Sequence, residues 1–469
     1  MIRTVLAHEW RLLRRAPATW IALALLAVSI VFGASNGGRW ADFQHQTLAE
    51  AEAYEAETYG DLARRAAAPD GEWPDPSSAA NIGMFYGRYA TLPPGPLAPL
   101  AVGQSDVAPY ALYVSGKTLA STHTKSAEEL GNPQAYVTGR FDTAFALVVV
   151  LPLVLLVLLF DIASGERERE TLGLVLSQPV RPGTLVWAKA GLRWALVAGV
   201  AWAASALGLA LFGADLGAAP GGLALALLAV AAYAAVWTAL AVWVATRGWP
   251  SATNALVLAA VWVAVVVVVP GLIGAASGAL EPVPSRTHLI EAHREADTRF
   301  AARGGELLTA YYDANPGAQP ADLDPMQYDF PLYYTARQGA MQDTLAPLLR
   351  RYDDALAAQE RLANGLALLS PAALLQNTLA AVAGTDHARH AAYLRQVEDF
   401  HAAHRDFFAP RAYQRVALTA SDYEAMPRFA FVEPGAVATR ALWPLGGIAV
   451  LALTLAACAA PGLRRITTH

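Results

Sequence analysis

The chain has few charged residues and almost no cysteine. Only 16% of its 469 residues are charged, against about a quarter in ordinary soluble domains, whereas 55% are hydrophobic. The single cysteine, Cys458, excludes an intrachain disulfide and any metal site built from several cysteines. The net charge is −5 and no dense cluster of Lys and Arg is present, so no nucleic-acid partner is expected. A membrane protein is therefore the first class to consider.

Catalytic motifs are also missing. The nearest approach to a phosphate-binding loop is GKT at 116–118, but Ala111 occupies the position of the required first glycine. His8-Glu9 lacks the second histidine of a zinc-protease helix, and the sequence has no Gly-x-Ser-x-Gly elbow. An intramembrane protease needs ionisable groups inside its spans, and the predicted spans have none. We therefore expect no enzymatic activity in this chain.

What the sequence does have is long apolar stretches. Six of them are uncharged and long enough to cross a bilayer, which takes about 20 residues. They lie at about 17–34, 143–160, 194–214, 223–245, 252–272 and 441–460. We predict an all-α integral membrane protein with six transmembrane helices. A further apolar stretch, 364–383, contains three amide side chains; Ser370 and Pro371 suit its helix start, and it is either an interfacial helix or a seventh span.

Basic residues indicate which side of the membrane each loop occupies. Short loops rich in Lys and Arg stay cytoplasmic. Such residues precede the first span, separate the second span from the third and the fourth from the fifth, and follow the sixth. The loop between the third and fourth spans has Asp215 but no Lys or Arg. Both termini are therefore predicted to be cytoplasmic, with the first span an uncleaved signal anchor; a cleaved signal peptide is the alternative.

Two long polar regions, 35–140 and 274–438, then lie outside the cytoplasm. The first opens with an Ala/Glu-rich helical stretch at 41–68 and continues through Pro/Gly-rich loops. The second has helical periodicity over 286–312, 334–366 and 386–408. In the last of these, His387 and His390 form one pair and His401 and His404 another, about 21 Å further along a helix. We therefore predict a packed face there and no metal site.

Two short segments lie on the predicted cytoplasmic side. Residues 1–16 place apolar side chains on one helical stripe and arginines off it, which predicts an interfacial amphipathic helix. The loop 162–183 carries five alternating charges, from Glu166 to Glu170, followed by an apolar run that ends before Pro179. A charged start and an apolar end suit docking into a groove on another protein, although a solvated hairpin has the same charge pattern.

These segments resemble the permease subunits of ABC type-2 transporters. The resemblance is carried by GRFD (139–142), SGERE (164–168), LSQP (176–179), LSP (369–371) and AGTD (383–386). It is strongest to a subgroup with two large periplasmic regions, related to the permease family of nitrous-oxide-reductase maturation. It covers most of the chain, and its most specific motif is the 164–179 loop.

The resemblance implies a non-catalytic permease in the bacterial inner membrane. Separate cytoplasmic ATPase subunits would bind ATP and Mg, a second copy or a homologous permease would complete a dimer, and lipid would surround the spans. Closure of the ATPases would drive export or periplasmic remodelling. The alternative is a membrane-anchored periplasmic scaffold or receptor without ATP coupling.

The resemblance also assigns residues and segments. The ATPase-facing coupling residues would be Glu166, Arg167, Glu168, Arg169, Glu170, Thr171, Leu172, Leu174 and Leu176, and a connecting helix would carry Trp10, Arg11, Arg14 and Arg15. The implied organisation is a connecting helix at 1–16, span one at 17–34, a periplasmic region at 35–140, span two at 141–161, the coupling loop at 162–183, spans three to five at 184–273, a second periplasmic region at 274–438, span six at 439–461 and a tail at 462–469.

Overall fold

The computed structural model describes residues 2–67, 73–117, 140–171, 181–319 and 330–464. The chain is 78% helical. Its two named strands, β1 (Arg88–Thr91) and β2 (Ala111–Val114), form one antiparallel pair. Within the described residues, six helices are long and apolar enough to cross a membrane. The predictions of a predominantly helical fold and of six candidate spans are confirmed.

The candidate spans are longer than the apolar stretches from which they were predicted. They are α2 (Pro17–Ala67), Thr143–Glu168, α10 (Pro182–Leu211), α11 (Pro220–Ala245), Ser251–Leu280 and α20 (Val437–Leu463). The second comprises α6 (Thr143–Phe145), a π-helical segment (Ala146–Val150), α7 (Leu151–Leu159) and α8 (Ser164–Glu168). The fifth comprises α12 (Ser251–Trp262), a π-helical segment (Val263–Val268) and α13 (Val269–Leu280). Several helices continue well into polar flanks, so polarity alone does not mark their ends.

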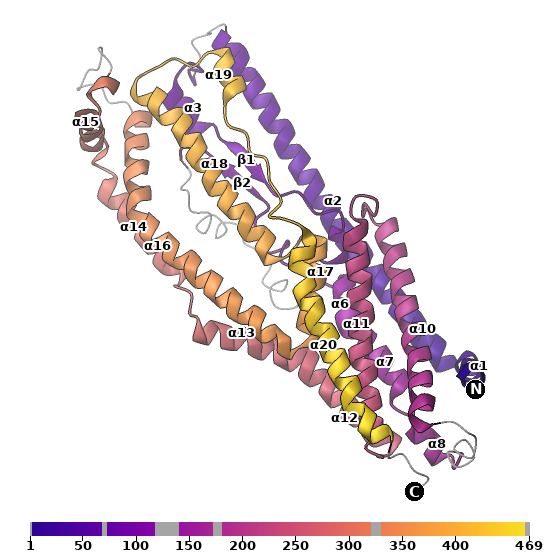
Figure 1. Cartoon of the computed structure of the whole chain (residues 1–469). Helices are drawn as coiled ribbons and strands as arrows, with labels where there is room; N and C mark the ends of the chain where they lie inside the picture. The colour runs from indigo at the N-terminus through magenta and orange to yellow at the C-terminus, as the bar shows by residue number, and fades with distance from the viewer. Residues whose placement is uncertain (1, 68–72, 118–139, 172–180, 320–329, 465–469) are drawn as a thin grey trace.

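Helix α11 forms the centre of the bundle, with α7, α10 and α20 packed around it (Figure 1). Its Tyr233 and Trp237 are fully buried, and the Tyr233 hydroxyl donates a 2.8 Å hydrogen bond to the Val148 carbonyl. Helices α12 and α13 are the least covered and expose large apolar side chains such as Leu256 and Leu272. The N- and C-termini lie at the same end of the bundle, called here the terminal end, beside α1 (Ile2–Arg15) and α8 (Figure 1).

Helix α2 continues beyond the bundle without a break. Its 51 residues make it about 76 Å long, more than twice the thickness of a membrane core. The predicted helical stretch 41–68 is therefore the continuation of the first span. The far part of α2 runs along a second region, the distal lobe (Figure 1). This lobe contains α3 (Ala79–Phe85), β1, β2, α14 (Arg286–Phe300), α15 (Gly304–Ala314), α16 (Phe330–Leu366), α18 (His387–Tyr413) and α19 (Ala420–Ala425).

The distal helices match the predicted periodic runs with one difference. The run 286–312 forms two helices, α14 and α15, instead of one. Two consecutive glycines, Gly304 and Gly305, favour a break because glycine loses the most backbone freedom in a helix. The other two runs are single helices, α16 and α18; α16 starts four residues earlier than predicted and α18 ends five residues later.

Helix α17 (Pro371–Ala383) occupies most of the apolar stretch 364–383. As predicted, Pro371 is its first residue and the Ser370 hydroxyl caps it, accepting a 3.1 Å hydrogen bond from the Ala373 amide. The helix has 13 residues and is about 20 Å long, too short for a seventh span. Most of its side chains are buried, and it packs against α11 and α20. Helix α17 thus packs inside the molecule, and its position at the level of the membrane surface stays a prediction.

Three glycines let α2 approach other segments closely. A Cβ atom on Gly33 would lie 2.4 Å from the Asp142 carbonyl carbon, and one on Gly37 would lie 2.4 Å from the Pro99 carbonyl oxygen. One on Gly38 would lie 2.5 Å from the Phe212 carbonyl oxygen. Backbone atoms cannot rotate away as side chains do. Small residues at such spacing are typical of closely packed membrane helices.

We predict that Gly37→Ala lowers the stability of the detergent-solubilised protein by about 1–3 kcal/mol, the usual range for overpacking. Gly199→Ala on α10 is the matched control, because nothing lies within 4 Å of the new methyl group. The control should be neutral or stabilise by up to about 1 kcal/mol, since alanine is the better helix former. Thermal unfolding followed by tryptophan fluorescence measures both. Equal melting temperatures for the two variants would contradict the close packing of α2.

Candidate functional site

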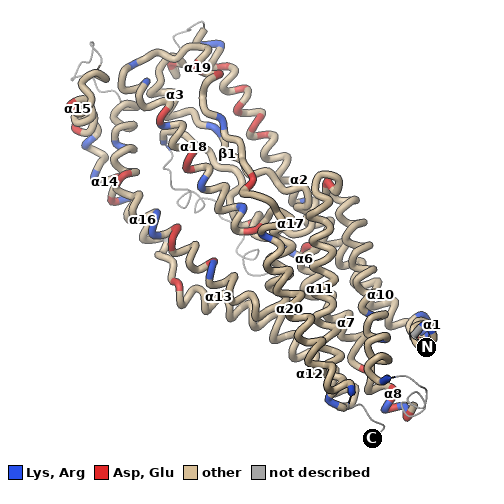
Figure 2. The backbone as a smooth tube through the Cα atoms, in the orientation of Figure 1, with Lys and Arg blue, Asp and Glu red and all other residues tan. Residues whose placement is uncertain are grey.

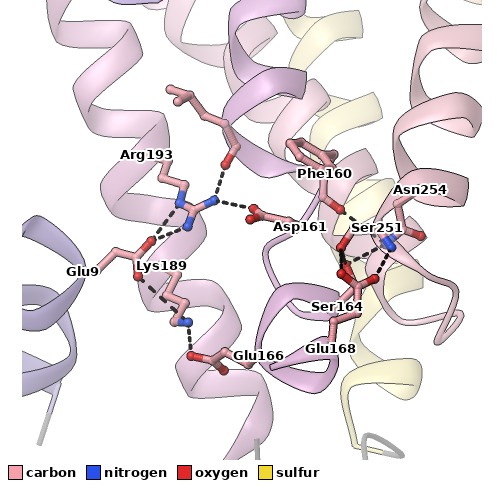
Figure 3. Close-up of polar contacts among 11 residues, drawn as sticks. Glu9, Phe160, Asp161, Ser164, Glu166, Glu168, Lys189, Arg193, Ser251 and Asn254 are labelled. Atoms are coloured by element: carbon pink, nitrogen blue, oxygen red, sulfur yellow. Dashed lines mark hydrogen bonds and ion pairs between the residues drawn. The ribbon is translucent and has the colours of Figure 1, made fainter. Parts of the chain in front are cut away.

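A network of charged side chains joins several helices at the terminal end of the bundle (Figure 3). Lys189 and Arg193 are separated by one turn on α10, so they lie on one face of that helix. They face three carboxylates from other segments: Glu9 of α1, Asp161 after α7, and Glu166 of α8. The network thus brings together side chains that are far apart in the sequence.

Arg193 connects α10 to α1. Its Nη2 and Nε atoms lie 2.5 and 2.8 Å from Oε1 of Glu9, and Nη1 lies 3.3 Å from Oδ1 of Asp161. Nη1 also donates to the Leu158 carbonyl. The Glu9 side chain is 1% exposed and that of Arg193 13%. Buried charges are tolerated only where opposite charges and hydrogen bonds replace water. Glu9 and Arg193 therefore hold α1 against α10.

Lys189 extends this connection to α8. Its Nζ atom donates to Oε1 of Glu166 and lies 3.9 Å from Oε2 of Glu9. The Lys189 side chain is 7% exposed, whereas that of Glu166 is 22% exposed. Glu166 thus lies at the edge of the network and Glu9 at its centre. A single buried carboxylate, Glu9, interacts with both cations of α10.

A second set of polar contacts joins α8 to the start of α12 (Figure 3). Oε1 of Glu168 accepts a 2.6 Å hydrogen bond from the Ser251 amide, and Oε2 accepts a 2.9 Å bond from the Ser251 hydroxyl. The hydroxyls of Ser164 and Ser251 are 2.7 Å apart, and Arg167 donates a 2.7 Å bond to the Trp249 carbonyl. The first amides of a helix have no partner within it, so Glu168 supplies one that α12 lacks.

The end of α8 is closed by a two-bond motif. The Thr171 amide donates to the Glu166 carbonyl at 2.9 Å, and the Glu170 amide donates to the Arg167 carbonyl at 3.0 Å. This pattern places its last but one residue in the left-handed region, and Glu170 has a φ of 59°. Glycine is usual at such a position, because a side chain there costs about 1–2 kcal/mol. Glu170 therefore places a carboxylate at a position where glycine would avoid this conformational cost.

The predicted coupling residues divide into two groups. The side chains of Glu166, Arg167 and Glu168 contact other helices or loops. In contrast, Arg169, Glu170 and Thr171, just after α8, are exposed, and the Thr171 hydroxyl donates back to the Glu166 carbonyl. The remaining predicted residues, Leu172, Leu174 and Leu176, lie outside the described residues.

The predicted connecting helix is present as α1 and packs on α10. Trp10, Arg11, Arg14 and Arg15 are all exposed, and the Trp10 ring meets Trp20 edge-on with 6.4 Å between ring centres. The face that α1 buries contains Glu9 and Leu13.

Sequence reasoning missed the centre of the network. Helix α10 begins at Pro182, before the apolar stretch predicted at 194–214, and carries Lys189 and Arg193 into the bundle. Two signals could have pointed to them. Glu9 is the only acidic residue in the first 41 positions, which contain five arginines, and the two cations of α10 have the i, i+4 spacing of one helix face.

The two histidine pairs of α18 have different surroundings, and His401 and His404 line one cavity. His387 contacts Gln104 and Glu360, and His390 lies 3.0 Å from the Pro109 carbonyl. His404 is buried, which is the main reason why its pKa falls to about 4. Among the residues that the structure describes, no group of three or more His, Cys, Asp or Glu side chains could hold a metal ion. The absence of a metal site remains a prediction.

Comparison with known proteins adds one partial match. Residues 286–432 match the model of a family described as a domain of unknown function, DUF3526. The matched segment begins with α14, covers less than half of the chain, and falls within the polar region predicted at 274–438. It contains none of the charged network. No curated protein and no solved structure matches the chain.

We predict that Glu9→Ala destabilises the protein by about 3–5 kcal/mol, because it leaves two buried cations without their shared partner. His8→Ala, at the adjacent exposed position, is the control and should change stability by less than about 0.5 kcal/mol. The double variant Glu9→Ala/Arg193→Ala should lose less than the sum of the single losses, because the two residues interact directly. Denaturant titration in detergent micelles measures the wild type, the single variants Glu9→Ala, Arg193→Ala and His8→Ala, and the double variant. Strict additivity would show that the contact contributes nothing to stability.

Proposed function

We propose that the chain is the non-catalytic permease subunit of an ATP-driven ABC type-2 transporter, moved through α8 by separate cytoplasmic ATPase subunits. The observation that carries the proposal is the double attachment of α8. Glu166 joins it to α10 through Lys189, and Glu168 joins it to α12 through Ser251. A short helix held on both sides in this way moves together with the helices to which it is attached.

The attachment through Lys189 is buried, whereas the contact between Glu168 and Ser251 is exposed. Ion pairs and charged hydrogen bonds with little access to water resist separation, because each broken contact leaves a charge without a partner. Displacement of α8 would pull on α10 through Lys189 and, through Glu9, on α1. The same displacement would reach α12 through Ser251. Force applied at one loop would thus reach three elements at once and change how the bundle opens.

The exposed residues just after α8 offer a surface to the ATPase. Arg169 and Glu170 carry opposite charges, which suits recognition because paired charges fix the register of a partner. The exposed arginines of α1 lie at the same end of the bundle (Figure 2). ATP and Mg²⁺ would be bound by the ATPase subunits. The uncovered apolar sides of α12 and α13 would face lipid or a second permease.

In this proposal both termini are cytoplasmic, and the distal lobe lies in the periplasm of a bacterial cell. The work performed would be export of a substrate, or remodelling of a molecule held by the distal lobe.

We predict that Arg169→Ala and Glu170→Gly together abolish ATPase copurification or permease-stimulated ATP hydrolysis while the permease stays folded. Glycine preserves the left-handed position, so the change removes side chains without disturbing the end of α8. Glu166 and Glu168 are left intact, because their loss would also break contacts within the chain. The equally exposed Glu57→Ala on the distal part of α2 is the control. Purification in mild detergent followed by mass spectrometry and a hydrolysis assay gives the readout.

Two results would count against the proposal. If the wild-type chain copurifies with no ATPase, a membrane-anchored scaffold becomes the better interpretation. If an ATPase is present and the double variant retains its association and stimulated hydrolysis, the residues just after α8 do not form the coupling surface.

We also predict that the distal lobe is periplasmic. In a Cys458→Ser background, cysteines placed at the exposed positions Glu57 and Arg351 should react with an impermeant thiol reagent once the outer membrane is permeabilised. A cysteine at Thr171 should react only after the inner membrane is broken. The reverse pattern would invert the topology and exclude a cytoplasmic ATPase at α8.

A further inference from the structure

A groove of about 750 Å³ runs between α2 and β1 in the distal lobe. One wall is the far part of α2, from His45 to Ala63. The opposite wall comprises Tyr89 and Thr91 of β1 together with residues 423–429. The α2 wall covers 18 residue steps, or about 27 Å. An extended chain of about eight residues has the same length.

The wall formed by β1 is the open edge of a sheet. Residues 88, 90 and 92 form the hydrogen-bonded pairs with β2, since the Leu92 amide donates to the Tyr110 carbonyl within the same register. In an antiparallel pair the residues between them turn their amides and carbonyls away from the partner strand. Tyr89 and Thr91 therefore direct theirs to the other side of β1, and both residues line the groove.

Among the described residues, only one main-chain group on this edge already has a hydrogen-bond partner. The Tyr89 amide donates a 3.0 Å hydrogen bond to Oε2 of Glu55, whose Oε1 binds Arg88. No hydrogen bond to the amide or carbonyl of Thr91 occurs within the described part of the chain. The Arg88 side chain is 6% exposed, and its Nε and Nη2 atoms also have no partner there. An open strand edge is a template for pairing with another chain.

The charge of the groove indicates the chemistry of the occupant. Between residues 40 and 63, α2 carries six carboxylates and no Lys or Arg, visible as the red positions on its far part (Figure 2). Of the charged side chains that line the groove, Glu55 is paired with Arg88, whereas Glu52, Glu424 and one cation, Arg428, are exposed, so that carboxylates outnumber arginines. Tyr59, Tyr423 and Phe429 add apolar surface between them. A basic chain with alternating apolar side chains complements this surface.

We propose that the groove binds an extended, basic segment of another polypeptide, which adds to β1 as a third strand. Main-chain hydrogen bonds to Thr91 would supply affinity, and contacts of alternate side chains with the acidic wall would supply selectivity. A saccharide or a lipid could use the aromatic rings, but neither offers the regular donors and acceptors that a strand edge pairs with. The inference does not depend on ATPase coupling, because none of its residues belongs to α8 or to the charged network.

The experiment measures peptide binding to the full-length chain in detergent by fluorescence anisotropy. The probe is a labelled, amide-capped octapeptide of alternating valine and lysine. The comparison peptides replace lysine by glutamate, or carry N-methyl groups on alternate amides. Thr91→Pro removes the outward amide, and proline is tolerated there because an edge strand does not use that amide internally. Thr91→Val retains the amide and the shape of the side chain and is the matched control.

We expect the basic peptide to bind the wild type and Thr91→Val alike. Binding should weaken by about tenfold in Thr91→Pro, the upper range for the loss of one hydrogen bond. The N-methylated and glutamate peptides should bind at least tenfold more weakly to the wild type, a comparison that needs no variant to fold. Equal binding of the methylated and unmethylated peptides, preference for the glutamate peptide, or no binding of any peptide would overturn the proposal.

Discussion

The terminal end of the bundle is organised by the need to neutralise two cations on one face of α10. Lys189 and Arg193 lie where water has little access, and an unpaired charge in such a place costs several kcal/mol. Glu9 meets both of them, and that requirement sets where α1 can lie. Glu166 completes the pairing of Lys189 and so sets the position of α8. Helices α1 and α8, which are far apart in the sequence, are thereby fixed to one another through α10.

The spans were predictable because their signal is local. An apolar run of about 20 residues has few alternatives to a membrane helix, and a serine before a proline at 370–371 marks a helix start by its own chemistry. The limits of the helices were less predictable. Helix α2 continues past residue 34 because the Ala/Glu-rich stretch that follows also favours helix, although its polarity changes.

The charged network was not predictable from local pattern, because its contacts are distant. Glu9 and Arg193 are 184 positions apart, and no sequence pattern around either residue indicates a contact with the other. The sequence predicted no role for Glu9, yet the structure buries it. The same limit applies to the loop at 166–171. Its alternating charges predicted a contact surface, but which of them are used within the chain depends on α10 and α12 lying on either side.

Helix α2 has a consequence that follows from its shape. A continuous helix is a stiff rod, and about 44 Å of this one, from Gly38 to Ala67, extends past the glycines that hold it to the bundle. A tilt of about 10° at those glycines would displace the far end by about 8 Å, by simple geometry from that length. A tilt of the spans would therefore rotate α2 as a rigid body about Gly33, Gly37 and Gly38. Small rearrangements among the spans would become large displacements of the distal lobe.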